Sequence, residues 1–321
     1  MNITIKDLAR ETGLTSATIS AYFNGASVRP YNRDKIERAV EKLGYIRNDY
    51  ARALRTHRSM TVGVLLPELY NAFAAGVVTQ IEDTLKQHRY GLLICDCRSD
   101  VGREGEAVRF LQSKTVDGLI VIPSSDSALS LDSAISKNLP LVAMDRYTES
   151  RNISHVVLSN RKTAREVTAR ILAEGRRKVG VIYGDQSVFK SRERLSGYRE
   201  AMREAGLDAE SFEECGDLTI DGGYEAMKRL LRAHPDLDGI FITSYEMTMG
   251  AAVAVDEAGL EFGKDISFTG FDCTKLLPRL FPGIHMVVQP LQEMGRVAAE
   301  TLLSMIEGGP VRNIVLDAEI I

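Results

Sequence analysis

The sequence predicts an α/β protein in which a small three-helix head precedes a two-lobed body of parallel sheets flanked by helices. Three observations lead to this prediction. Helical periodicity breaks into three short pieces within the first 45 residues. From Thr61 onward, compact apolar runs alternate with amphipathic stretches, as expected for strands that helices cover on both faces. This second region also contains two similar halves.

The three helical pieces cover residues 4–12, 15–23 and 30–43. Two short helices that cross steeply need a small residue at their contact, a turn residue that tolerates positive φ and an apolar anchor on the second helix. Ala9, Gly13 and Ile19 meet these needs in that order. We therefore predict a helix-turn-helix, and a helical hairpin with no DNA role is the alternative.

The second helix carries an unusual polar face for so short an element. Beneath it, a small core can form from Leu8, Leu14 and Tyr22. Thr4 and Thr15 are typical N-cap residues, and each helix N-terminus can face a phosphate. The residues left on the open face are Ser16, Ala17, Ser20 and Ala21. Such a face suits base edges and phosphates in a major groove.

Charge separates the head from the body. The first 60 residues carry a net charge of +5 and the remaining 261 carry −9, within a whole-chain charge of −4. A basic head on an acidic body indicates a polyanionic partner for the head. Residues 46–60 are basic and too poor in apolar positions for a core, which predicts a connecting segment with one short helix.

The apolar runs of the body predict strands joined by helices in right-handed crossovers. The segment that begins at Asp117 and Gly118 is echoed by the one that begins at Asp238 and Gly239. Each half also has an apolar run that an aspartate closes, at Asp145 and at Asp272. Two such α/β units form a cleft, and ligands bind beyond the carboxyl ends of the strands, where these aspartates fall.

Composition argues against several other classes. The N-terminus lacks the pattern of a signal peptide and no apolar window reaches membrane length, so we expect a cytoplasmic protein. The four cysteines have no metal-ligand or redox spacing, which predicts buried free thiols. The five histidines are scattered, and no P-loop, dinucleotide fingerprint or GxSxG elbow occurs. We expect no enzyme, no metal and no cofactor; a transport-type solute-binding protein remains a rival interpretation.

Several motifs, in combination and in order, resemble the lactose-repressor (LacI/GalR) family of bacterial transcription regulators. They are ITIKDLARETGLTSATIS, the linker GYIRNDYARALRT, and DGLIVIP, MDR, RERLSGY, GFD and QPLQEMG in the body. The resemblance covers essentially the whole chain. It implies a DNA-binding head, a hinge helix, and a type I periplasmic-binding-protein-like body that dimerises and senses a small molecule. The chain would then be a repressor without catalytic activity.

The resemblance also gives expected boundaries. The head would comprise residues 1–46, the hinge helix and linker 47–60, and the effector-binding and dimerisation body 61–321. Within the body, the N-terminal lobe would combine residues 61–159 and 289–310. The C-terminal lobe would combine residues 160–288 and 311–321. No leucine-heptad tail follows Ile321, so a homodimer on a pseudo-palindromic operator is expected.

The family's DNA contacts can be transferred to matching positions. Base readers fall on Ser16, Ala17 and Ala21, and phosphate contacts fall on Thr4, Thr18, Ser20 and Asn24, beside the N-cap Thr15. The family usually has Arg at the position of Ala21, and an arginine reads guanine through two hydrogen bonds. The operator should therefore differ from the family's common sequence, with Tyr22 reaching further than the usual aliphatic residue.

The linker matches the family's hinge helix, which forms when paired subunits occupy an operator. Asn48 begins this stretch, and Leu54 matches the leucine that wedges into the minor groove and kinks the duplex. Ala51 lets two hinge helices approach closely. Arg55, like Arg52 and Arg58, would contact phosphates, with a solvated surface role as the alternative.

The family's effector pocket maps onto Tyr70, Asn71, Phe73, Asp145, Arg194, Ser244, Asp272 and Leu291. The charged trio Asp145, Arg194 and Asp272 would bind sugar hydroxyls, while strand-end caps and an interlobe ion pair are the alternative interpretation. Leu218 replaces the family's stacking aromatic and Cys273 its second aspartate. Tyr245 would supply the missing ring or, alternatively, fill the pocket. A sugar or sugar-like metabolite other than a standard hexose is therefore expected; a protein co-regulator, or no effector, is the alternative.

Overall fold

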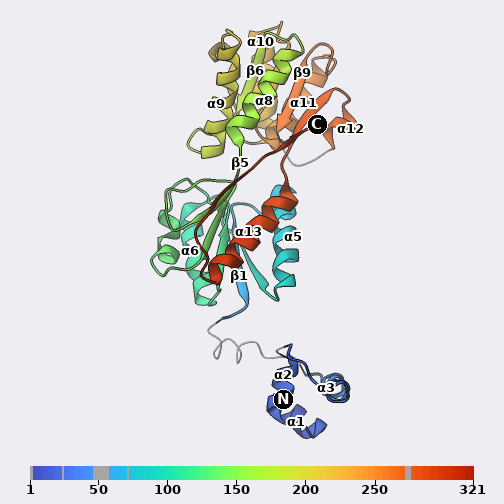
Figure 1. The fold of residues 1–321 in the computed structure, drawn as a ribbon. Helices are drawn as coiled ribbons and strands as arrows, with labels where there is room; N and C mark the ends of the chain where they lie inside the picture. Colours follow the sequence, from blue (N-terminus) through green and yellow to red (C-terminus); the bar gives the residue numbers. More distant parts are fainter. Residues whose placement is uncertain (1–2, 24, 46–57, 71, 272–275) are drawn as a thin grey trace. The chain divides into compact units, whose positions relative to one another are not determined.

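The computed structural model describes residues 3–23, 25–45, 58–70, 72–271 and 276–321 (Figure 1). The chain divides into two compact units, Met1–Ser59 and Met60–Ile321, and each is described by itself. The predicted residues Asn24, Asn71 and Asp272, and the hinge residues Asn48, Ala51, Leu54 and Arg55, lie outside the described residues.

The head consists of α1 (Ile5–Thr12), α2 (Ser16–Phe23) and α3 (Pro30–Leu43), within one residue of the predicted bounds. Its core is small. The buried members are Leu8, Ile19, Ile36, Ala39 and Tyr45. Gly13 ends α1 with φ of +69°, so the chain turns sharply into α2 through a conformation that residues with a Cβ rarely adopt. The predicted helix-turn-helix is therefore present.

The N-terminal lobe is built on a sheet whose described strands run in the order β11-β5-β4-β3-β1-β2, all parallel. Helices cover both of its faces (Figure 1). The strands are β1 (Thr61–Leu66), β2 (Gly91–Asp96), β3 (Gly118–Val121), β4 (Leu141–Met144), β5 (Ser154–Leu158) and β11 (Asn313–Leu316). The helices are α5 (Ala72–Gln87), α6 (Val101–Ser113), α7 (Asp132–Ile135) and α13 (Leu291–Ile306).

The C-terminal lobe repeats this plan with the strand order β12-β10-β9-β8-β6-β7, in which β12 alone is antiparallel to its neighbour. The strands are β6 (Val179–Tyr183), β7 (Glu213–Cys215), β8 (Gly239–Ile242), β9 (Ser267–Phe271), β10 (Ile284–Val288) and β12 (Glu319–Ile320). The helices are α8 (Asn160–Ala173), α9 (Phe189–Glu204), α10 (Ile220–Ala233), α11 (Tyr245–Glu257) and α12 (Leu277–Leu280).

The two Asp-Gly motifs have the same structural role in each lobe. Asp117 accepts a hydrogen bond from the amide of Met60, just before β1. Asp238 accepts from the amides of Arg177 and Lys178, just before β6. In each case the carboxylate satisfies donors at the start of the neighbouring parallel strand, which the sheet itself leaves unpaired. The internal echo in the sequence therefore reflects repeated sheet architecture.

The end of the chain corrects one expected boundary. Residues 311–321 were expected in the C-terminal lobe, but β11 pairs with β5 in the N-terminal sheet. Only β12 joins the C-terminal sheet, beside β10. The final segment is thus shared between the lobes, because the chain crosses between them again within Asp317 and Ala318. Short, partly polar edge strands give little sequence signal of the sheet they join.

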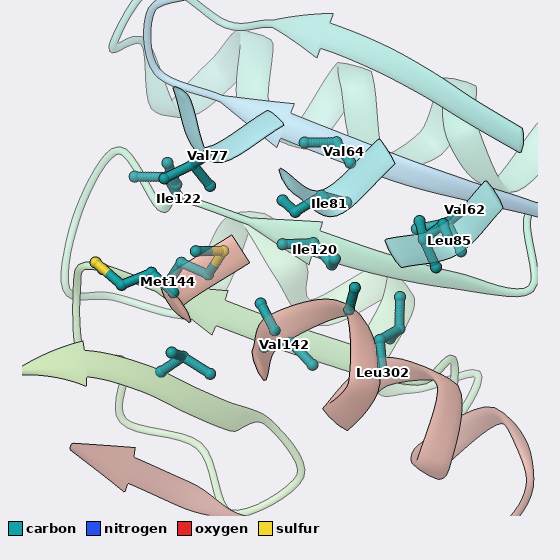
Figure 2. Packing of buried hydrophobic residues seen from close by; sticks show 14 of the residues in the cluster. Val62, Val64, Val77, Ile81, Leu85, Ile120, Ile122, Val142, Met144 and Leu302 are labelled. Carbon is teal, nitrogen blue, oxygen red and sulfur yellow. The ribbon is translucent and has the colours of Figure 1, made fainter. Parts of the chain in front are cut away.

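The core of the N-terminal lobe shows how helices fix the sheet (Figure 2). Alternate residues of each strand point to one face of a sheet. Side chains from β1, β3 and β4 on this face meet α5 and α13; they include Val62, Val64, Ile120 and Val142, packed against Val77, Ile81, Leu85 and Leu302. A Cβ on Gly295 of α13 would lie 2.8 Å from the carbonyl oxygen of Val77, so glycine is required for this close approach of α13 to α5.

The cysteines only partly follow the prediction of buried thiols. Cys97 is buried just beyond β2, and Cys95 is half-buried within that strand. Cys215 is exposed on the edge strand β7, so the prediction was wrong for this residue. Cys273 lies outside the described residues. None of the helices in the described part of the chain is long and apolar enough to span a membrane.

Candidate DNA-binding face and interlobe ligand site

Contacts at the N-terminus of α2 and on its buried side fix the orientation of the helix and leave its other face exposed. The Thr15 hydroxyl oxygen accepts the amide hydrogen of Thr18 at 3.2 Å, so Thr15 caps the helix as expected. Ile19 is fully buried against α1 and α3. Ser16 and Ala17 are exposed, while Thr18, Ser20 and Ala21 are partly exposed. This leaves a surface of small, uncharged side chains at the start of the helix.

Tyr22 packs against the core of the head, as predicted, and its polar end is also engaged there. Its hydroxyl donates a hydrogen bond to Glu37 of α3 at 3.0 Å. Its ring lies edge-on to Phe23, with 5.2 Å between the ring centroids. Partial burial, followed by the hydrogen bond to Glu37, raises the pKa of the phenol. Tyr22 thus joins α2 to α3 within the head, and its hydroxyl is already engaged there.

The start of α1 is fixed by a side chain one turn further along. Asp7 accepts hydrogen bonds from the backbone amide of Thr4 at 2.9 Å and from its hydroxyl at 2.7 Å. These hydrogen bonds lower the pKa of Asp7, so its carboxylate stays ionised at the positive end of the helix. The Thr4 hydroxyl can still accept a hydrogen bond, although its donor is used inside the head.

A cavity of about 390 Å³ lies between the two lobes of the body. Of the predicted effector residues, five line it: Tyr70, Phe73, Arg194, Ser244 and Tyr245. Tyr70 lies at the edge of the cavity and is 85% exposed. Leu291 does not line this cavity; its side chain packs on α5 near Gly76. Leu218, which replaces the expected aromatic, is also on the wall.

Asp145 lies just behind the cavity wall and is 1% exposed. Its carboxylate accepts a hydrogen bond from Lys190 of α9 at 2.5 Å, which joins the N-terminal to the C-terminal lobe. Burial alone would raise the pKa of Asp145, but the charges of Lys190 and Arg194 outweigh it and lower that pKa. The backbone of Asp145 adopts φ of +61°, a strained conformation that often accompanies functional sites.

Arg194 is held on three sides at the inner end of the cavity. Its Nε donates to the side-chain oxygen of Asn160 at 2.8 Å, and one terminal nitrogen donates to the carbonyl of Thr243 at 2.7 Å. The guanidinium carbon lies 3.4 Å from the centroid of the Phe271 ring. The side chain is only 4% exposed, so its direction is fixed before any ligand arrives.

The first turn of α9 makes further contacts across the lobes that the sequence did not indicate. Asp126, in the loop after β3, accepts the amide hydrogen of Phe189 at 3.1 Å and pairs with Arg192 at 2.7 Å. Asp126 therefore caps a helix of the opposite lobe. The ion pair that was expected only as an alternative also exists, but Asp145 makes it with Lys190.

Sequence reasoning missed other residues of this site. Lys190 precedes Arg194 by four positions on α9, and residues four apart share a helix face, so that spacing could have revealed it. Arg146 also lines the cavity, next to the predicted Asp145. Gln289 begins the QPLQEMG motif but was not predicted to line the site. Asn160 and Thr243 come from distant segments, and nothing local in the sequence marks them.

The paired short helices, the interlobe cavity and the two repeated sheets define a two-part regulator with a DNA-binding head and a ligand-sensing body. The model for bacterial regulatory proteins of the lacI family matches residues 4–48, and that for the periplasmic binding protein domain matches residues 62–310. The chain therefore belongs to the lacI family of bacterial transcriptional regulators.

Named relatives agree with this membership. The HTH-type transcriptional regulator RegA of Clostridium saccharobutylicum is 30% identical over 100% of this chain and 98% of its own length. The ribose operon repressor of Haemophilus influenzae is 30% identical over 95% of this chain and 92% of its own. One is named as a transcriptional regulator and the other as an operon repressor.

Solved structures show the same architecture. The transcriptional regulator CelR in complex with cellobiose is 29% identical, with a TM-score of 0.75 over 99% of this chain and 98% of its own. The lac repressor dimer bound to operator has a TM-score of 0.87 over 100% of this chain and 98% of its own, at 23% identity. The second likeness concerns the fold alone.

Proposed function

We propose that this regulator is a repressor that binds a pseudo-palindromic DNA operator as a homodimer and responds to a small molecule in the interlobe cavity. The observation that carries the DNA part is the exposed, uncharged face of α2, fixed by the Thr15 cap and the buried Ile19. A helix presented in this way fits the major groove, where its first residues reach base edges. A DNA partner would also make the cytoplasm its site of action.

The contacts divide into those that read bases and those that position the head. Ser16, Ala17 and Ala21 would meet base edges, where a methyl group on the protein favours contact with the methyl of thymine. Thr4, Thr15, Thr18, Ser20 and Asn24 would meet phosphates. In the linker, Leu54 would enter the minor groove beside Ala51, with Asn48 and Arg55 at the backbone. The operator should therefore differ from sites that an arginine at position 21 would select.

A titration of fluorescent duplexes with the full chain tests the DNA part. An operator selected from a random pool should bind far more tightly than unrelated DNA, and the logarithm of its affinity should fall linearly with the logarithm of salt. Ala17→Glu should abolish operator binding because it brings a negative charge to phosphate and base edges. Ala173→Glu, on an exposed position of α8, is the matched control and should change nothing. A salt-independent affinity would sink the proposal.

The ligand part follows from the cavity. Arg194, Ser244 and Tyr245 line it together with Tyr70 and Phe73, a mixture of fixed polar groups and rings that suits a sugar or sugar-like metabolite. Such a ligand controls operator affinity only through different affinities for the two lobe arrangements. Screening sugars and sugar derivatives for a change in operator affinity tests this part. If no compound acts and a protein partner does, the cavity has another role.

A further inference from the structure

The inner end of the interlobe cavity gathers basic side chains. Arg146 follows β4, while Lys190 and Arg194 project from one side of α9, and all three line the cavity. Among the described residues, two carboxylates interact with these cations: Asp145, whose pKa the charges of all three lower, and Asp185, whose pKa is lowered by its hydrogen bonds with Ser187 and by the charge of Arg146. In the described part of this site, three cations therefore face two carboxylates, which leaves an excess of one positive charge.

The acidic side chains of the cavity lie elsewhere on its wall. Glu68 and Glu246 both raise the pKa of Tyr70, which is 85% exposed, so they lie together at the solvent edge. Asp217 is exposed as well, and its carboxylate accepts the amide hydrogen of Thr219 at 3.0 Å within its own turn. The cavity is thus polarised, with acidic side chains beside Tyr70 and basic side chains beside Asp145.

Several buried polar atoms at the inner end of the cavity have no hydrogen-bond partner among the described residues. One carboxylate oxygen of Asp145 takes Lys190, but the other, Oδ1, is buried with no hydrogen-bond partner among the described residues. The same holds for Nε of Arg146, although a terminal nitrogen of that side chain donates to Ser124 at 2.6 Å. The Thr243 hydroxyl is likewise buried without a partner in the described chain. Buried polar groups are normally satisfied, so these atoms mark places for ligand atoms.

We propose that the ligand of this cavity is a polyhydroxylated anion, a sugar acid or a sugar phosphate, whose charged group binds Lys190 and Arg146 while a hydroxyl donates to Asp145. This inference rests on the proposed function, because it names the chemistry of the same site. A neutral sugar supplies a donor for Oδ1 of Asp145. It supplies no charge to balance the basic side chains, whose hydrogen bonds to an anion are the stronger kind.

Calorimetric titration of the full chain tests the proposal, and calorimetry is suitable because the chain has no tryptophan to report binding. The probes are two matched sets: glucose, gluconate and glucose 6-phosphate, and galactose, galacturonate and galactose 6-phosphate. In at least one set, the acid or the phosphate should bind about tenfold or more tightly than the neutral sugar, because a charge-assisted contact is added. Comparing acid with phosphate distinguishes the two sources of charge.

Variants distinguish binding of an anionic ligand by these basic side chains from simple neutralisation of Asp145. Lys190→Gln and Arg146→Gln should each weaken binding of the anion more than binding of the neutral sugar, and so reduce the preference for the anion. Arg203→Gln, which removes a charge from an exposed position of α9, should keep the full preference. Circular dichroism of each variant establishes that it is folded, and Arg146 provides a second test if Lys190 proves necessary for folding.

Three results would overturn the inference: a neutral sugar that binds as tightly as its acid and phosphate, an anion preference that survives both substitutions, or no binding in either set. Operator titration in the presence of each probe tests the proposed function separately. If an anion binds as expected and operator affinity is unchanged, the ligand chemistry stands and control of DNA binding fails. If a neutral sugar alone binds and shifts operator affinity, control of DNA binding stands and the proposed ligand chemistry fails.

Discussion

The candidate sites in the head and in the body of this regulator are formed in opposite ways. The surface of α2 that faces outward in the head comes from one continuous stretch of eight residues over a core of five buried side chains. The interlobe cavity draws its lining from segments between Pro67 and Gln289, supported by four buried clusters. The head site is local and weakly supported, whereas the body site is assembled from distant segments and strongly supported.

Removing a core side chain should have the largest effect, and it should differ between the two units. Ile19→Ala and Ile81→Ala remove the same atoms from fully buried positions in the head and in α5. Each should cost about 3 kcal/mol of unfolding free energy. That cost is comparable with the whole stability of so small a unit, so Ile19→Ala should abolish operator binding.

Differential scanning calorimetry and operator titration measure this contrast. Ile81→Ala should lower the unfolding temperature of the body and leave the head folded and able to bind DNA. Equal loss of operator binding in both variants would contradict the separate support of the two units.

The next largest effect concerns the buried guanidinium of the cavity. Arg194→Ala removes the donor to Asn160 and Thr243 and one of the charges that stabilise ionised Asp145. Unsatisfied buried groups of this kind should cost the body about 2 kcal/mol. Operator binding without ligand should be almost unaffected. Thermal unfolding of the body reports the loss, and Arg203→Ala, at an exposed position on the same helix, should leave it unchanged.

A matched pair of glycines sharpens the comparison further. Gly13 in the head and Gly206 in the body have φ of +69° and +70°, and a Cβ would meet nothing within 4 Å at either. Alanine should therefore cost each unit about 1 kcal/mol through backbone strain alone. Because a small unit has a smaller unfolding entropy, its unfolding temperature should fall by roughly 5 to 8 °C, against about 2 °C for the body. Equal shifts would mean that the units unfold together.

The smallest expected effect is a pH dependence confined to the body. His155 is 1% exposed, and burial lowers its pKa although hydrogen bonds to Asn313 and Thr148 oppose the change. The folded body therefore binds a proton less readily than the unfolded chain. The contribution of His155 to the stability of the folded body is therefore complete above the ordinary pKa of 6.5, and it is lost as the pH falls below that value.

Urea unfolding between pH 7.5 and pH 5 measures this dependence, in the range where the unfolded histidine gains its proton at a pKa of about 6.5. His155→Gln should flatten the loss of stability at acid pH. The exposed His88→Gln is the control and should retain the slope of the unmodified chain. An unchanged slope in His155→Gln would show that other groups cause it.

The sequence by itself determined the parts whose causes are local. Helical periodicity, the Thr15 cap and the turn at Gly13 define the head, because each acts within a few residues. Apolar runs between amphipathic stretches likewise predicted the central strands of both sheets and their covering helices. The echo of Asp117 in Asp238 indicated the repeated plan, since both carboxylates satisfy the same unpaired strand donors.

Only the tertiary structure decided the rest. It brought Lys190 onto Asp145 and Asp126 onto the start of α9, and it engaged the Tyr22 hydroxyl with Glu37 inside the head. It also assigned β11 to the N-terminal sheet. These contacts join residues far apart in sequence, and each forms only after whole elements have packed. No local pattern encodes such a pairing, because the free energy that selects it comes from the burial of entire helix and sheet faces.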